Sequence, residues 1–102
     1  MIHVIATIEL KPDSRDAWLA EFHNVEPLVK AENGCIEYAA GFDIATGIAV
    51  QPPTREQTAI VVEKWNDIEA LKTHLAAPHM ATYRERVKEL VTGVTLHVLR
   101  PA

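Results

Sequence analysis

Side chains suited to chemistry on a small aromatic molecule are concentrated in the stretch 63–83. It contains Trp65, His74, His79 and Tyr83, which are one of the two tryptophans, two of the five histidines and one of the two tyrosines. A partly buried imidazole with a pKa near neutrality is a natural general base for a phenol or an enol. An indole can stack on a planar ligand. The grouping indicates a candidate site at one strand-to-helix corner.

His74 is the candidate base. At helical spacing it lies beside an apolar stripe made of Ile68, Leu71 and Leu75. The same position also suits a structural histidine bonded to a backbone carbonyl. Trp65 ends a predicted strand, where its indole either stacks on a substrate or anchors the core. The residues alone leave both choices open.

Two further polar residues flank this pair. Glu63 shares a strand face with Trp65 and can orient a substrate hydroxyl or a histidine, although an ion pair with a neighbouring strand or subunit is the more ordinary expectation. His79 follows His74 by five residues across Pro78. That spacing does not place both rings on one helix face, as a metal pair would require. We therefore expect His79 at the pocket rim or in solvent, and no metal site.

Four aromatic or soft residues are expected to face the core and, secondarily, to line the pocket. They are Phe22, Tyr38, Met80 and Tyr83.

The elements that must position these residues follow from hydrophobic periodicity. Alternating patterns predict strands at 2–10, 35–43, 57–65 and 94–100. A helix is expected between the caps at 13–14 and the Asn33-Gly34 stop, kinked or split by Pro27. Two more helices are expected at 67–76 and 78–91, with Gly93 ending the second. The order predicts one α+β domain over residues 1–102, a ferredoxin-like β-α-β-β-α-β fold whose four-stranded antiparallel sheet carries its helices on one face.

The strands are apolar on both faces, since Ile60 and Val62 alternate with Ala59 and Val61. Helices on one side leave the other side uncovered, so we expect a homodimer in which two sheets pack face to face. The connection 44–56 contains the apolar run 48–50 and is predicted to reach across to the partner subunit.

Composition narrows the function classes. The net charge is −4 and the basic residues near 84–88 alternate with glutamates, which argues against nucleic acid. No apolar run is long enough to cross a membrane, and the N-terminus lacks the basic start of a signal peptide, so we expect a cytoplasmic protein. Cys35 is the single cysteine and is expected to pack. No flavin, haem or nicotinamide motif is found, and no iron or copper ligand set is apparent, which predicts that no cofactor is used.

With this pattern in place, the sequence resembles the antibiotic biosynthesis monooxygenase family, including quinol monooxygenases. The resemblance covers nearly the whole chain. It is carried by 4–12, by Asn33-Gly34-Cys35, by Glu63-Lys64-Trp65-Asn66-Asp67, and by His74 with Pro78-His79-Met80.

The resemblance implies a dimeric α+β barrel with a pocket between each subunit's sheet and its helices. It also implies oxidation of quinols or anthrones by dioxygen without a cofactor. A haem-degrading branch of the family uses a tryptophan, a histidine and an asparagine on the first strand. Trp65 and His74 match the first two, but Ala6 and Thr7 occupy the place of the asparagine, which argues against haem. The 44–56 connection is also longer than the family pattern implies.

The functional prediction is a cofactor-independent monooxygenase acting on a small hydroxylated aromatic, with His74 and Trp65 as the catalytic pair. Two alternatives stay open at this point. The domain could bind a small molecule without catalysis, or it could be an isomerase or epimerase that uses His74 to move a proton.

Overall fold

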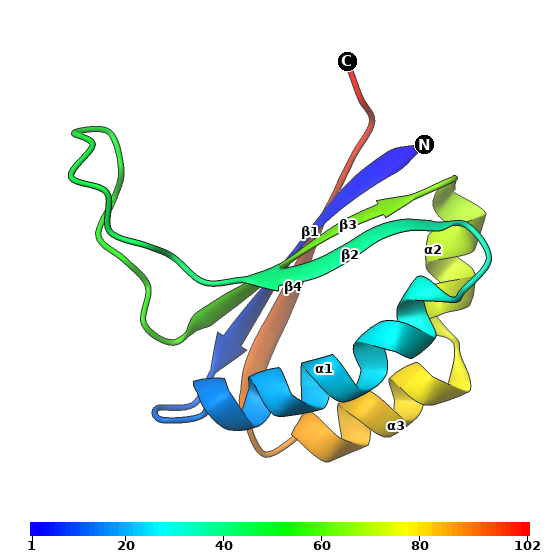
Figure 1. Cartoon of the computed structure of the whole chain (residues 1–102), viewed down its shortest axis with the longest axis horizontal. Helices are drawn as coiled ribbons and strands as arrows, with labels where there is room; N and C mark the ends of the chain where they lie inside the picture. The colour runs from blue at the N-terminus through cyan, green and yellow to red at the C-terminus, as the bar shows by residue number, and fades with distance from the viewer.

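The computed structural model describes residues 1–102 and has the predicted ferredoxin-like α+β architecture (Figure 1). The elements are β1 (Ile2–Leu10), α1 (Arg15–Lys30), β2 (Cys35–Gly41), β3 (Thr58–Trp65), α2 (Ile68–Leu75), α3 (Pro78–Val87) and β4 (Val91–Leu99). No helix combines the length and the apolar character that crossing a lipid bilayer requires.

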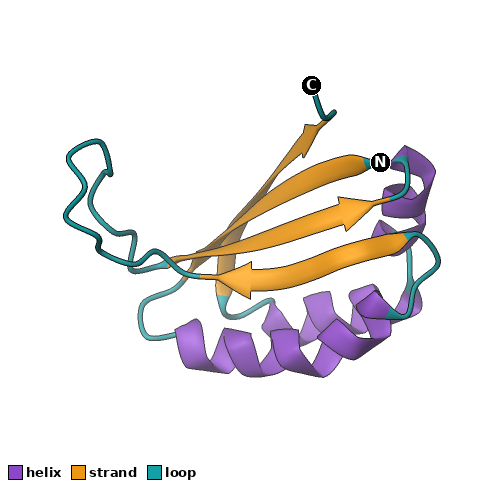
Figure 2. Ribbon diagram, turned by 45° about the horizontal axis from the view of Figure 1, so that its top comes forward, coloured by secondary structure: helices purple, strands orange, loops and turns teal.

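The strands form one antiparallel sheet in the order β2-β3-β1-β4. α1 and α3 run along one face of the sheet, and α2 lies at the end where β3 finishes (Figure 2). The alternation predicted for β1 is present, because five alternate residues are buried: Ile2, Val4, Ala6, Ile8 and Leu10. One side of α1 is also buried, at helical spacing: Trp18, Phe22, Val25 and Val29.

The two helices that follow β3 begin where their sequence predicts. The Asp67 side chain accepts a 2.8 Å hydrogen bond from the Ala70 amide, which satisfies a free donor at the start of α2. Pro78 is the first residue of α3, where its missing donor costs nothing. α1, in contrast, continues as one helix through Pro27, so of the two predicted effects of this proline the split is wrong.

The third helix ends earlier and the fourth strand begins earlier than predicted. α3 stops at Val87, and a tight turn follows in which the Leu90 amide bonds the Val87 carbonyl at 2.8 Å. Val91 then pairs with Leu10, so ladder bonds to β1 replace the last predicted helical turn. Gly93 lies inside β4 opposite Glu9, next to a β-bulge, and does not end a helix.

β2 also departs from the simple alternation. It ends at Gly41 rather than Asp43, and its register shifts between Cys35 and Glu37. The shift leaves Ile36 53% exposed, although Tyr38, two residues further along the strand, is buried. The irregular start of the strand thus keeps Ile36 out of the core.

The sheet face away from the helices has no cover within the chain, and it mixes apolar residues with polar ones such as Thr7 and Lys64. Register and alternation place Ile5, Ile60 and Val62 on that face, and Val62 is 38% exposed. The connection 44–56 projects beyond the sheet (Figure 2). Its base is closed by an ion pair of 2.9 Å between Arg55 Nε and Asp43 Oδ2.

Candidate active site

A cavity of about 500 Å³ lies between the helix-facing side of the sheet and the helices α2 and α3. Its wall is mainly apolar, and it extends to Val94 and Leu96 of the edge strand β4, which remain exposed. The volume is within the range of small-molecule sites. Five of the predicted site residues line it: Tyr38, Glu63, His74, Met80 and Tyr83.

His74 is the most deeply buried titratable residue of this wall, with 1% of its surface exposed. Its Nδ1 lies 2.9 Å from Oε2 of Glu32. Burial lowers the pKa of His74, and the nearby Glu32 carboxylate opposes that shift only in part. Burial thus favours the neutral ring, and the tautomer that donates from Nδ1 to Glu32 carries its lone pair on Nε2.

Nε2 of His74 has no hydrogen-bond partner in the protein. Every side-chain nitrogen or oxygen that lacks a partner is at least partly accessible to solvent. Nε2 is therefore reached by solvent, and His74 itself lines the cavity. A neutral imidazole held through Nδ1 by a carboxylate, with a free Nε2, is the arrangement of a general base.

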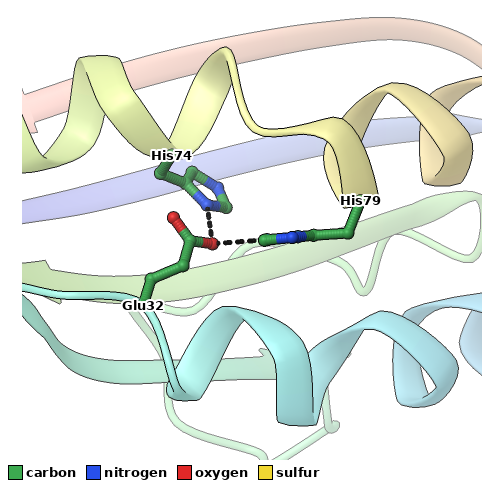
Figure 3. Close-up of side chains that lie close together, drawn as sticks. All are labelled: Glu32, His74 and His79. Atoms are coloured by element: carbon green, nitrogen blue, oxygen red, sulfur yellow. Dashed lines mark hydrogen bonds and ion pairs between the residues drawn. The ribbon is translucent and has the colours of Figure 1, made fainter.

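Glu32 is the residue that sequence reasoning missed. It lies in the turn between α1 and β2, and its Oε2 also lies 2.8 Å from Nε2 of His79 (Figure 3). The two histidines occupy different helices, so they converge on one oxygen although they share no helix face. The five-residue spacing correctly excludes a shared helix face, but it gives no sign that the two rings meet through tertiary structure. His79 does not line the cavity and instead borders a separate groove between α1 and α3.

Glu63 is buried, with 4% of its surface exposed, and it forms no ion pair within the chain, so the expected pair with a neighbouring strand is absent. Its one hydrogen bond comes from Nε1 of Trp65, at 2.9 Å to Oε1. Burial raises the pKa of Glu63 to about 7, the charge of Glu32 adds to the rise, and the Trp65 donor opposes it. The cavity thus contains a carboxyl group that exchanges protons near neutral pH.

Trp65 does not line the cavity. It is fully buried, and its ring centroid lies 4.6 Å from that of His74 at an interplanar angle of 35°. Its indole supports His74 and orients Glu63, so the structure places it behind the site rather than against a ligand. Phe22 likewise lies behind the wall, stacked on Tyr38 with centroids 5.3 Å apart.

Tyr83 presents a phenol to the cavity, and Nε1 of Trp18 donates to its oxygen at 2.7 Å. Burial raises the pKa of Tyr83 to about 12, despite the Trp18 donor. Burial also raises the pKa of Tyr38. Both phenols stay protonated at neutral pH and can donate hydrogen bonds to a ligand.

Comparison with known proteins places this domain and its site in a family. The family model described as "Antibiotic biosynthesis monooxygenase" matches residues 1–86. The Escherichia coli K12 protein named "Probable quinol monooxygenase YgiN" is 36% identical over 99% of this chain and 98% of its own length. The chain belongs to the antibiotic biosynthesis monooxygenase family, which supports a monooxygenase-type function.

Solved structures agree with this assignment. Rv0793 from Mycobacterium tuberculosis aligns with a TM-score of 0.79 at 30% identity, over 99% of this chain and 94% of that one. PA3566 from Pseudomonas aeruginosa aligns with the same TM-score at 24% identity, over 99% of this chain and 94% of that one, and supports the fold alone.

Proposed function

We propose that the protein oxidises a small hydroxylated aromatic, such as a quinol, with dioxygen and without a cofactor. The observation that carries the proposal is the placement of His74, whose Nδ1 lies 2.9 Å from Oε2 of Glu32 and whose side chain lines a mainly apolar cavity. The E. coli relative is named a quinol monooxygenase, which fits a hydroxylated ring as the substrate.

In the proposed reaction, Nε2 of His74 removes the proton of a ring hydroxyl. The resulting imidazolium is stabilised by the Glu32 carboxylate 2.9 Å from Nδ1. The phenolate gives up electrons to dioxygen far more easily than the phenol does. A quinol and dioxygen then yield a hydroxyquinone and water: one oxygen atom enters the ring, and the other leaves as water with two hydrogens from the substrate.

The other polar groups of the wall would orient the ring. The carboxyl of Glu63 can bond a second hydroxyl group, since it accepts when ionised and donates when protonated. Tyr83 donates its own proton while Trp18 fixes its oxygen. The apolar remainder of the wall, including Met80, holds the ring and excludes water.

An isomerase is the second candidate, because Glu63 and His74 both line the cavity and could together move a proton between two positions of one substrate. Such a reaction consumes no oxygen. Dioxygen uptake therefore separates the two functions, and ligand binding without turnover would indicate a binding protein.

The test is oxygen uptake with a panel of quinols, anthrones and flavonoid-like phenols, using protein freed of metal and flavin. His74→Ala should remain folded and lose about 10²–10⁴ in rate, because a placed base typically contributes that much. His23→Ala is the control, since His23 is paired with Glu26 on the exposed side of α1. Undiminished uptake in His74→Ala, or a strict need for added flavin or metal, would contradict the proposal.

We also propose that the active form is a homodimer. The uncovered sheet face offers Ile5, Ile60 and Val62 to a second copy, and sheet-on-sheet packing would remove this apolar surface from water. The exposed side chains of Ile48 and Val50 in the projecting connection would then have a partner subunit to contact.

A further inference from the structure

We propose that Glu32, His74 and His79 bind a divalent transition-metal ion such as Zn²⁺. Each side chain offers one ligand atom: Oε2 of Glu32, Nδ1 of His74 and Nε2 of His79. The three atoms lie within 4.8 Å of one another (Figure 3). They come from the α1–β2 turn, from α2 and from the first turn of α3, so tertiary structure alone brings them together.

The spacing of the ligand atoms is close to that of an occupied site. The two histidine nitrogens lie 2.9 and 2.8 Å from the Glu32 oxygen. Around a tetrahedral zinc ion, with bonds of about 2.0–2.1 Å, ligand atoms lie about 3.3 Å apart. To hold the ion, each histidine nitrogen must move about 0.5 Å further from the Glu32 oxygen, and the two nitrogens, which lie within 4.8 Å of each other, must come to about 3.3 Å.

The donor set determines the class of ion. Two imidazoles and one carboxylate suit Zn²⁺ and other first-row transition metals, whereas Mg²⁺ and Ca²⁺ prefer oxygen ligands throughout. Three protein ligands leave the fourth tetrahedral position for water or another small ligand.

The surroundings hold the ligands and leave a way in. The His74 ring is packed between Trp65 and Tyr38, with centroids 4.6 and 5.5 Å away. The Ala77 amide bonds the His74 carbonyl at 3.1 Å and fixes the turn that brings His79 back to the site. His79 borders a groove of about 350 Å³ between α1 and α3, which gives an ion a route from solvent.

Metal binding would also change the proton on His74, a consequence that rests on the proposed function. An ion on Nδ1 takes the position of the proton now donated to Glu32, and the neutral ring must then carry its proton on Nε2. The cavity-facing nitrogen becomes a donor and can no longer accept a substrate proton. A bound ion would therefore inhibit the proposed oxidation.

The direct test is titration of the chelator-treated, untagged full chain with Zn²⁺ by calorimetry, and with Co²⁺ followed by its visible absorption. One ion per chain should bind. Replacing a residue that only holds a metal ligand in place typically weakens metal affinity about 10–100-fold. His79→Ala and Glu32→Gln change a ligand itself, so each should weaken Zn²⁺ affinity at least about 100-fold. His23→Ala removes a histidine that also contacts a carboxylate, at 3.0 Å, but in an isolated pair, and should bind normally.

Absence of saturable binding at one ion per chain would overturn the site, and so would binding that His79→Ala and Glu32→Gln leave unchanged. Thermal unfolding of each variant without metal distinguishes a lost ligand from a lost fold. Binding is measured without substrate, so its outcome is independent of the proposed oxidation. Oxygen uptake by the chelated protein tests that oxidation separately.

Discussion

The indole Nε1 of Trp65 donates a 2.9 Å hydrogen bond to Oε1 of Glu63, two residues earlier on the same face of β3. Both side chains are buried, and no cation contacts the carboxyl group. A single neutral donor does not offset the cost of removing a carboxylate from water, so the pKa of Glu63 rises to about 7. The strand thus carries a group that penalises folding when it ionises.

Glu63→Gln should therefore change how stability depends on pH. With a pKa raised from 4.5 to about 7, the folded protein holds a proton that the unfolded chain releases between these values. The free energy of unfolding of the wild type then falls as pH rises through that window. Glutamine does not ionise, so position 63 causes no such fall in the variant. Urea unfolding should find the variant gaining roughly 2–3 kcal/mol on the wild type between pH 5 and pH 8.

Glu69→Gln is the matched control, because Glu69 is an exposed residue of α2. It should follow the wild-type pH dependence. Parallel curves for Glu63→Gln and the wild type would show that Glu63 is already ionised at pH 5 in the folded protein.

Most of the fold was predictable because short-range hydrophobic patterns in the sequence specify its strands and helices. Alternation in β1 and the helical stripe of α1 each specify a buried face without knowledge of the rest of the chain. Two of the errors lie where pairing with a distant strand decides the local structure. Val91 joins β4 because Leu10 is available to pair with it, and Ile36 leaves the core because β2 is bulged against β3.

The site was predictable only in part. His74 and Tyr83 could be selected by residue type and position, and both line the cavity. Glu32 could not, because it is 42 residues from His74 in sequence and lies in a turn with no motif of its own. The burial of Trp65 also depends on the packing of α2 against the end of β3, which strand periodicity does not describe.

Tyr83→Phe should destabilise the protein through Trp18. The indole of Trp18 is fully buried, and its Nε1–H donates to the Tyr83 oxygen at 2.7 Å. Loss of that oxygen leaves a buried donor unpaired, which costs about 1–3 kcal/mol. Urea unfolding measures the change. Trp18→Phe removes the donor. In that background Tyr83→Phe should therefore lower the free energy of unfolding clearly less than it does in the wild type, and equal losses in the two backgrounds would contradict the hydrogen bond.

Glu32→Gln should reduce the rate of the proposed oxidation without weakening substrate binding. Glutamine can still accept from Nδ1 of His74, but it provides no negative charge to stabilise the imidazolium that forms when His74 takes a proton. We expect kcat to fall by about 10–100-fold, as for other residues that orient a functional histidine, with KM little changed. Steady-state oxygen uptake measures both. Glu26→Gln, which alters the carboxylate beside exposed His23, is the control, and a change in KM alone would contradict the role.

Val62→Lys should dissociate the proposed homodimer. Val62 stands opposite Ile5 on the uncovered sheet face, where a partner sheet would bury it, and an unpaired buried ammonium group is costly. Sedimentation at micromolar concentration should give a dimer for the wild type and a monomer with an unchanged circular-dichroism spectrum for the variant. Leu28→Lys, at an exposed position of α1, should remain dimeric. A wild type that sediments as a monomer would refute the dimer itself.

Removal of residues 47–53 should weaken the same dimer without unfolding the domain. The deleted segment includes Ile48 and Val50, which are 62% and 90% exposed and contribute nothing to the core of the single chain. The Asp43–Arg55 ion pair lies outside the deletion and can still close the shortened connection. If the two side chains insert against the partner subunit, the lost apolar contact of about 1.5–3 kcal/mol per side chain should raise the dimer dissociation constant by at least about tenfold. Sedimentation across a dilution series measures this constant, and an unchanged value would show that the connection does not contact the partner.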